Sequence, residues 1–242
     1  MKYILDLHCH TVSSGHAYST ITENAAHAAS IGLTHMGIAD HGPGIPGGAH
    51  LYHFLNITAL PDYIHGVRIL KGAEANIMSY DGELDLPKVA LKKMDFVIAS
   101  MHRGVLHSAG HKANTNAIIC AMENPNVHII GHPNNITYPI DIEAMVKAAS
   151  RTKTIIEINN HSLIPGSFRY NGNEEIIQTI NLCKEYGVHI LASSDAHFHE
   201  SVGDFKFATD LIEASGIPEE LVVNTSYERL CNAINMKKDM IK

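Results

Sequence analysis

The stretch YILDLHCH, residues 3–10, joins a short apolar run to two histidines, His8 and His10. Side chains alternate along an extended strand, so these two imidazoles project to the same side and Cys9 to the other. Imidazole is a common ligand of Zn²⁺, Mn²⁺ and Fe²⁺. We therefore expect a first strand over residues 4–8 that ends in a pair of metal ligands.

The same order, an apolar run followed by a histidine or an acid, recurs along the chain. Further strands are predicted over 36–39, 67–73, 96–101, 127–130, 154–158 and 188–192, with a weak one over 221–223. Helices are predicted over 20–31, 51–64, 114–123, 142–150, 174–186, 205–214 and 227–235. Strands that alternate with helices favour parallel pairing, in a barrel or in an open doubly wound sheet. No low-complexity tract or Pro/Ser-rich linker divides the chain, so one domain over residues 1–242 is expected.

Polar residues with metal-binding side chains stand at the ends of nearly all these strands or close behind them. In a parallel barrel these ends meet at the C-terminal mouth, where the loops after the strands build active sites. Nine candidate ligands result: His8, His10, His16, His41, Glu74, His102, His132, Asp195 and His197. Nine ligands exceed the needs of one ion, so two or three ions bridged by a carboxylate such as Glu74 are expected. The excess of imidazole over carboxylate favours Zn, Mn or Fe over Mg or Ca.

The composition limits the classes of partner. Hydrophobic residues make up 45% of the chain and the net charge is −7 with neutral histidines. No basic field is present to attract nucleic acid or an anionic membrane, so neither partner is expected. No apolar run approaches the 18 residues of a membrane span, and no leader is apparent, so we expect a cytoplasmic protein. The four cysteines are far apart and are expected to be buried apolar residues rather than ligands.

The motifs around these residues resemble those of the PHP (polymerase and histidinol phosphatase) superfamily. They are DLHCHT (6–11), ADHG (39–42), the histidine at 102 together with GHP (131–133), and SDAH (194–197). Four longer stretches resemble the YcdX-type phosphatases of that superfamily: SGHAYST (14–20), GAEANI (72–77), VHIIGHP (127–133) and EINN (157–160).

The resemblance implies a distorted (β/α)7 TIM-like barrel with the metal site at its C-terminal mouth, three divalent metal ions and a homotrimer. Zinc is the metal implied first, with manganese or iron as alternatives. The implied ligand sets are His8, His10, Glu74 and Asp195 for one ion, His16, His41 and His197 for a second, and Glu74, His102 and His132 for a third.

The expected reaction is hydrolysis of the phosphate monoester of a small phosphorylated substrate, with a metal-activated hydroxide as the nucleophile. Positive charge from the ions would replace a basic pocket, which agrees with the acidic net charge. Arg103, next to His102, is the candidate clamp for a phosphate oxygen, and His50 or His53 the candidate proton donor to the leaving group. The loop 42–48 and the segment 161–172 are expected to shape specificity.

Other functions remain open at this point. Within the same chemistry they are a phosphodiesterase or 3′→5′ exonuclease, against which the acidic balance argues, and a histidinol phosphatase, which usually has a longer chain. A non-catalytic metal-binding protein is disfavoured because structural zinc sites are closed and usually Cys-rich. Amidohydrolysis is disfavoured because no lysine stands on a strand where it could be carbamylated.

Overall fold

The structure, a computed structural model, describes residues 1–170 and 173–239. Of the segment 161–172 expected to shape specificity, residues 171 and 172 lie outside this part. The strands are β1 (Leu5–Cys9), β2 (His35–Ile38), β3 (Tyr63–Ile64), β4 (Val67–Asn76), β5 (Phe96–Ser100), β6 (Ile129–Ile130), β7 (Ile155–Asn159) and β8 (Ile190–Ser193). All seven strongly predicted strands are therefore present, and β3 is an addition.

The strands form one sheet in the order β1-β2-β4-β5-β6-β7-β8, with every neighbouring pair parallel and β3 antiparallel to the edge of β4. The two outer strands approach each other and nearly close a barrel. Beyond the end of β8, Ala196 bridges Cys9, and the His10 amide donates to the Ala196 carbonyl at 2.8 Å. The expected TIM-like barrel is confirmed.

Asn224 fills the rest of the seam between β1 and β8. Its side-chain oxygen accepts from the Ala192 amide at 2.7 Å, and its Nδ2 donates to the carbonyls of Leu5 at 3.1 Å and Ala192 at 2.8 Å. A fully buried side chain thus replaces missing strand–strand hydrogen bonds.

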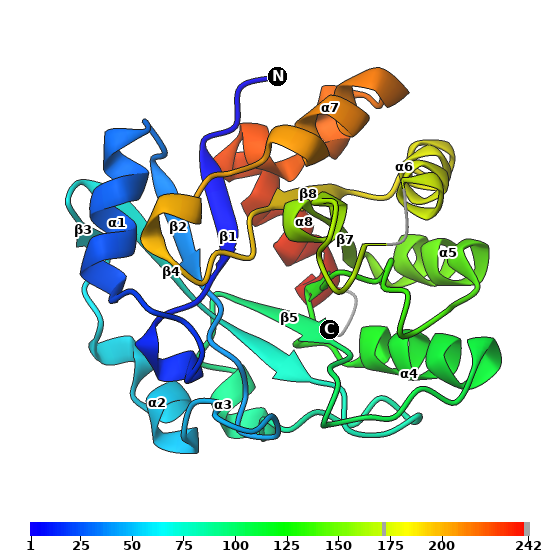
Figure 1. The fold of residues 1–242 in the computed structure, drawn as a ribbon, viewed down its shortest axis with the longest axis horizontal. Helices are drawn as coiled ribbons and strands as arrows, with labels where there is room; N and C mark the ends of the chain where they lie inside the picture. The colour runs from blue at the N-terminus through cyan, green and yellow to red at the C-terminus, as the bar shows by residue number, and fades with distance from the viewer. Residues whose placement is uncertain (171–172, 240–242) are drawn as a thin grey trace.

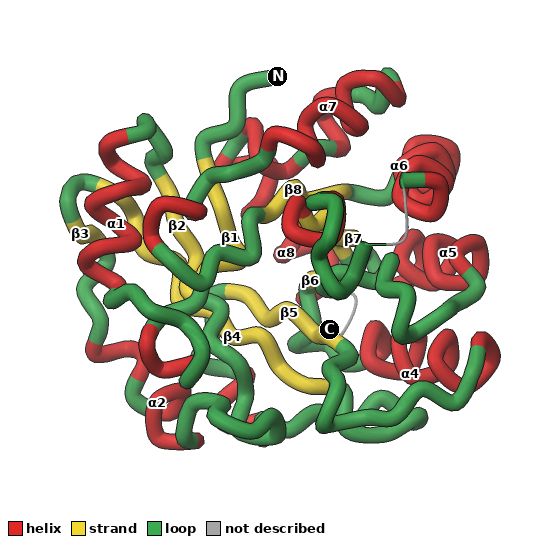
Figure 2. Tube along the Cα trace, viewed as in Figure 1, coloured by secondary structure: helices red, strands yellow, loops and turns green. Residues whose placement is uncertain are grey.

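The helices surround the sheet (Figures 1 and 2). They are α1 (Ile21–Ser30), α2 (Leu51–Leu55), α3 (Lys88–Leu91), α4 (His111–Glu123), α5 (Ile142–Thr152), α6 (Glu174–Tyr186), α7 (Lys206–Ser215) and α8 (Tyr227–Asp239). The capping box predicted for the first helix is present: Thr20 caps the Glu23 amide, and the Glu23 carboxylate accepts from the Thr20 amide. In the described part of the chain, no helix has the length and apolarity that a bilayer crossing requires.

The barrel interior is filled by apolar side chains from alternate strand positions, among them Leu7, Phe96 and Leu191. Phe96 fits because glycine stands opposite it: a Cβ on Gly72 would lie 2.3 Å from the ring's Cζ. Residues of α8, including Leu230, join the same cluster and close the barrel at the end away from the mouth. The interior below the mouth is thus filled by apolar side chains, and the candidate metal-binding residues lie at or just beyond the strand ends.

Two predicted elements differ from the structure. The helix expected over 51–64 ends at Leu55 and is followed by a 3-10 turn over Ile57–Ala59. Pro61 excludes a helix through the remaining positions, and Tyr63–Ile64 pairs with Val67 and Arg68 as a hairpin. The weak strand at 221–223 is instead two short 3-10 turns with a single bridge from Val222 to Ile190.

Candidate metal centre

Glu74 stands at the centre of the mouth. It lies near the end of β4, and its carboxylate is completely buried. Around Oε2 lie His8 Nε2 at 3.4 Å, His10 Nε2 at 3.6 Å and His41 Nδ1 at 2.7 Å. Around Oε1 lie His132 Nε2 at 2.9 Å and His102 Nε2 at 3.2 Å. Five imidazoles from the ends of four strands, β1, β2, β5 and β6, thus converge on one carboxylate.

Asp195, which follows β8, supplies the second buried carboxylate. Its Oδ1 lies 3.2 Å from His10 Nε2 and 3.6 Å from His8 Nε2. Its Oδ2 faces the other way and accepts from Asn159 and Arg169. One oxygen of Asp195 therefore faces the imidazoles, and the other is held by the surrounding protein.

His16 and His197 complete the group at its outer side. Their Nε2 atoms are 3.0 Å apart, and the ring of His16 lies 5.0 Å from that of His41, centroid to centroid. His197 Nδ1 is 3.6 Å from Asp195 Oδ1. All nine predicted residues are thus brought together, and we call them the histidine–carboxylate cluster.

Several polar atoms of this cluster are buried without a hydrogen-bond partner. They are Nε2 of His8, His10 and His102, Nδ1 of His41 and Oε2 of Glu74; the last two lie 2.7 Å apart but without the geometry of a hydrogen bond. A buried polar atom without a partner costs about 1–3 kcal/mol, so such atoms are rare unless a ligand satisfies them. Imidazole nitrogens and carboxylate oxygens that face one another are the donor set that a divalent transition metal prefers. In the described residues, three overlapping groups of this kind fit a metal ion: His8, His10 and Glu74; His10, His41 and His197; His41, Glu74 and His102.

The electrostatics of the cluster also favour a cation. Burial alone would raise the pKa of Glu74, but His102, His8 and His41 hold it well below its usual value. Asp195 behaves alike: Arg169 and His8 outweigh its burial and keep its pKa well below normal. Burial, reinforced by the neighbouring His41 and His197, holds the pKa of His10 well below normal. These groups are therefore held as carboxylates and a neutral imidazole, the forms that bind metal.

Two of the nine residues have unusual backbone conformations. His132 and Asp195 adopt φ angles of 28° and 55°, in the left-handed region that residues other than glycine rarely use. Such conformations persist where the surrounding structure holds them, and they concentrate at functional sites.

Glu157, on β7, orients the cluster from behind. Its Oε1 lies 2.5 Å from His8 Nδ1, and its Oε2 accepts from the His132 amide at 2.5 Å. Ser193 donates to Oε1 at 2.6 Å. The sequence places Glu157 at a strand end, but it does not distinguish a metal ligand from a residue that orients one. The structure shows that it contacts the opposite nitrogen of His8.

Asp40 has the same function on the other side. It accepts from the amide and hydroxyl of Thr11 and, at 2.7 Å, from the Ser14 hydroxyl, which lies 3.1 Å from His10 Nδ1. Burial opposes ionisation of Asp40, but hydrogen bonds from His53 and Ser14 lower its pKa to about 2. Asp40 thus fixes the orientation of His10 without facing the cluster.

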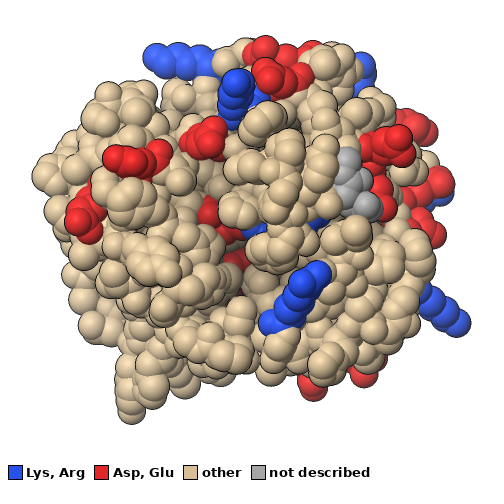
Figure 3. Space-filling view, in the orientation of Figure 1, with Lys and Arg blue, Asp and Glu red and all other residues tan. Residues whose placement is uncertain are grey.

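A cavity of about 330 Å³ opens onto the cluster. It is lined by His16, His41, Ile45, His102, Arg103, His161, Phe168, Arg169, Asp195 and His197. On this face, Figure 3 shows acidic and basic atoms inside a hollow near the middle, surrounded mostly by uncharged residues. The position of Arg103 agrees with a role in binding an anion. Arg169 was not predicted, because nothing in the sequence links it to Asp195.

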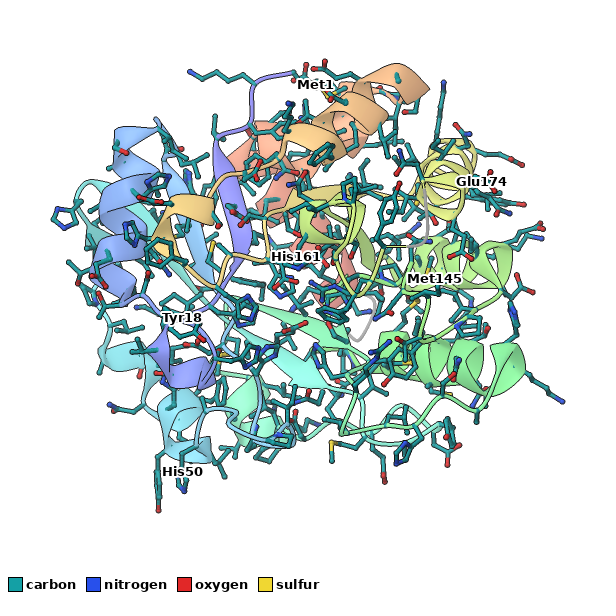
Figure 4. All side chains as sticks on the ribbon, in the orientation of Figure 1. Met1, Tyr18, His50, Met145, His161 and Glu174 are labelled. Carbon is teal, nitrogen blue, oxygen red and sulfur yellow. The ribbon has the colours of Figure 1, made fainter. Side chains whose placement is uncertain are left out.

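The two histidines expected as proton donors lie elsewhere. His50 is exposed and caps α2 by accepting from the Tyr52 amide at 3.2 Å. Figure 4 places it at the edge of the molecule, far from His161 near the middle. His53 faces Asp40, 3.2 Å from its Oδ2, and does not line the cavity. This geometry gives neither residue a position from which to protonate a leaving group.

The fold and the cluster define this molecule as a TIM-like barrel with a candidate metal centre at its C-terminal mouth. The model of the PHP domain family matches residues 6–163, and the chain belongs to that family.

The chain is also similar to individual proteins of known sequence or structure. A probable phosphatase of Thermoanaerobacter sp. (strain X514) is 48% identical over 242 residues, which cover 100% of this chain and 98% of that protein. A probable phosphatase of Acetivibrio thermocellus is 42% identical over 242 residues, covering 100% and 99%. The solved structure of histidinol phosphate phosphatase from Lactococcus lactis, complexed with zinc, L-histidinol and phosphate, superposes with a TM-score of 0.63 at 16% identity, covering 89% of this chain and 95% of that one. At that identity the last match supports the fold alone.

Proposed function

We propose that this protein is a metal-dependent phosphatase that hydrolyses the phosphate monoesters of small molecules. The observation that carries the proposal is the convergence of seven imidazoles and two carboxylates, several with unpartnered buried atoms, on a cavity that also contains Arg169. The relatives named as probable phosphatases support it, as does the barrel from Lactococcus lactis that was solved with zinc and phosphate.

Three divalent ions, with zinc first and manganese or iron as alternatives, would use the whole cluster. One would be held by His8, His10, Glu74 and Asp195, one by His16, His41 and His197, and one by Glu74, His102 and His132. Bound there, the ions would supply positive charge to phosphoryl oxygens and lower the pKa of water to near neutrality. The unpartnered atoms belong to all three sets, which supports this division.

The side chains of the chain itself would bind and orient the ester. Arg169 is almost completely buried at the cavity wall, and its remaining N–H groups suit a phosphoryl oxygen. Ile45 and Phe168 give the cavity an apolar side against which a leaving group can pack. The volume of about 330 Å³ is at the small end of ligand sites, which favours a small molecule over a polymer.

The test is phosphate release from a panel of simple monoesters by protein as purified, after chelation, and after Zn²⁺ or Mn²⁺ is restored. Release should disappear on chelation and return with metal. His10→Ala and Asp195→Asn should each abolish release and lower the metal content. His107→Ala, which alters an exposed loop histidine, is the matched control and should keep full activity. Full activity in either cluster variant, or release that ignores chelation, would contradict the proposal.

An assay with the diester bis(p-nitrophenyl) phosphate distinguishes a phosphomonoesterase from a phosphodiesterase. Turnover of this diester comparable with that of monoesters would favour a phosphodiesterase instead.

A further inference from the structure

Phe168 forms part of the cavity wall between two arginines. It lies on the loop after the 3-10 turn Asn160–Leu163, and 57% of its surface is exposed. The guanidinium carbon of Arg169 is 5.1 Å from the centroid of its ring and that of Arg103 is 5.7 Å away. Cations at this distance are attracted to the ring, so one exposed aromatic side chain holds two positive charges at the same cavity.

The two arginines differ in how their charge is balanced. Arg169 is 6% exposed and ion-paired with Asp195 Oδ2, yet its Nε is buried without a hydrogen-bond partner. Asp195 occupies only part of the guanidinium. A buried N–H without a partner at a cavity wall is satisfied when an anion binds there.

Arg103 carries a charge that no carboxylate balances in the described part of the chain. Its Nε and Nη2 both donate to the Thr137 hydroxyl, at 2.9 and 2.6 Å, which holds the side chain in place. By contrast, Arg151 on α5 is paired with Glu123 at 2.6 Å. Arg103 therefore presents a positioned and uncompensated guanidinium to the cavity.

We infer that the substrate carries two anionic groups: the phosphoryl group that Arg169 contacts beside the cluster, and a carboxylate or second phosphate on the leaving group that Arg103 contacts. This inference rests on the proposed phosphatase function and names its substrate class. It assigns Arg103 to the second anion instead of the transferred phosphoryl group. A fixed guanidinium pairs with carboxylate or phosphate through two parallel hydrogen bonds, which makes it a specificity-determining residue.

Binding of phosphonates tests this without turnover, because their C–P bond is not hydrolysed by a phosphatase. Carboxyalkylphosphonates with two to four methylenes are compared by calorimetry with alkylphosphonates of equal length, on the metal-loaded protein. At least one acid should bind about 10-fold or more tighter than its alkyl partner, the value of a charge-assisted hydrogen bond.

Arg103→Met should reduce that preference to about 2-fold or less and leave alkylphosphonate binding unchanged, while Arg103→Lys should restore part of it. Arg169→Lys should weaken both kinds of ligand. Arg151→Met is the matched control and should change neither. The inference is overturned if no acid of any length binds tighter than its partner, or if Arg103→Met weakens both kinds alike. Loss of phosphate release with this preference intact would count against the proposed catalysis alone.

Discussion

Glu157 and His8 face each other at the base of the cluster, with Oε1 of the carboxylate 2.5 Å from Nδ1 of the ring. Both side chains are fully buried. Because Nδ1 is engaged, Nε2 is the nitrogen directed at Glu74 and Asp195. A carboxylate behind a metal-binding imidazole fixes the ring and raises its basicity. Burial alone would lower the pKa of His8, but Glu157, Glu74 and Asp195 hold it well above normal.

Glu157→Gln should therefore weaken metal binding without removing a ligand. We expect a 10- to 100-fold loss of metal affinity, the usual effect of changing such a partner, with activity that recovers when excess metal is added. Metal titration of the chelated protein measures it. Glu143→Gln, on an exposed ion pair of α5 with Lys147, is the control. Unchanged affinity in Glu157→Gln would show that the contact does not orient a ligand.

Chelation should destabilise the folded protein. Ions that bind only the native state add about 4 kcal/mol per site at 1,000-fold saturation, so their removal should lower the melting temperature by roughly 10 °C or more. Differential scanning calorimetry with and without chelator measures the shift. The same chelator should have a smaller effect on Asp195→Asn, which lacks a ligand of one of the three ions. Superimposable melting curves for the untreated and chelated wild type would contradict metal binding at the cluster.

Asn224→Ala should open the seam between β1 and β8. The change removes three buried hydrogen bonds and leaves the Ala192 amide without a partner. We expect a loss of about 3 kcal/mol in the free energy of unfolding, measured by urea denaturation. Asn181→Ala, at an exposed position of α6, should change stability by less than about 0.5 kcal/mol. Equal stability of the two variants would mean that the seam does not depend on Asn224.

Lys237 should make stability depend on pH. It lies on α8 with its side chain buried, and its Nζ donates to the Met122 carbonyl and the Thr154 hydroxyl. Burial lowers its pKa from 10.5 to about 7. Between these two values the unfolded chain binds more protons than the folded one, so this residue adds stability as pH rises, by up to about 1.4 kcal/mol per pH unit. The difference in unfolding free energy between wild type and Lys237→Met should therefore grow in favour of wild type from pH 7 to 10. Parallel pH profiles would contradict the lowered pKa.

The sequence predicts the barrel well because each strand is a short apolar run followed by a polar residue. That pattern can be recognised from neighbouring residues alone. It fails at 51–64, where the apolar pattern suits a helix but Pro61 and the hairpin of Ile64 with Val67 prevail.

The nine cluster residues could be found because parallel topology brings strand ends together. Arg169 could not, because its contact with Asp195 depends on the path of an irregular loop. His50 and His53 were predicted at the site because they follow the Gly/Pro loop, but the structure places them elsewhere. His50 caps the N-terminus of α2, and His53 faces Asp40.

We propose that a multinuclear metal centre at the mouth performs the hydrolysis. The most direct measurement is a titration of the chelated protein with Zn²⁺, in which bound metal per chain and the rate of phosphate release are followed on the same samples. Release should rise as the sites fill and level off at three ions per chain. Full release with less than one ion per chain, or no release from fully loaded protein with any monoester, would contradict hydrolysis by such a centre.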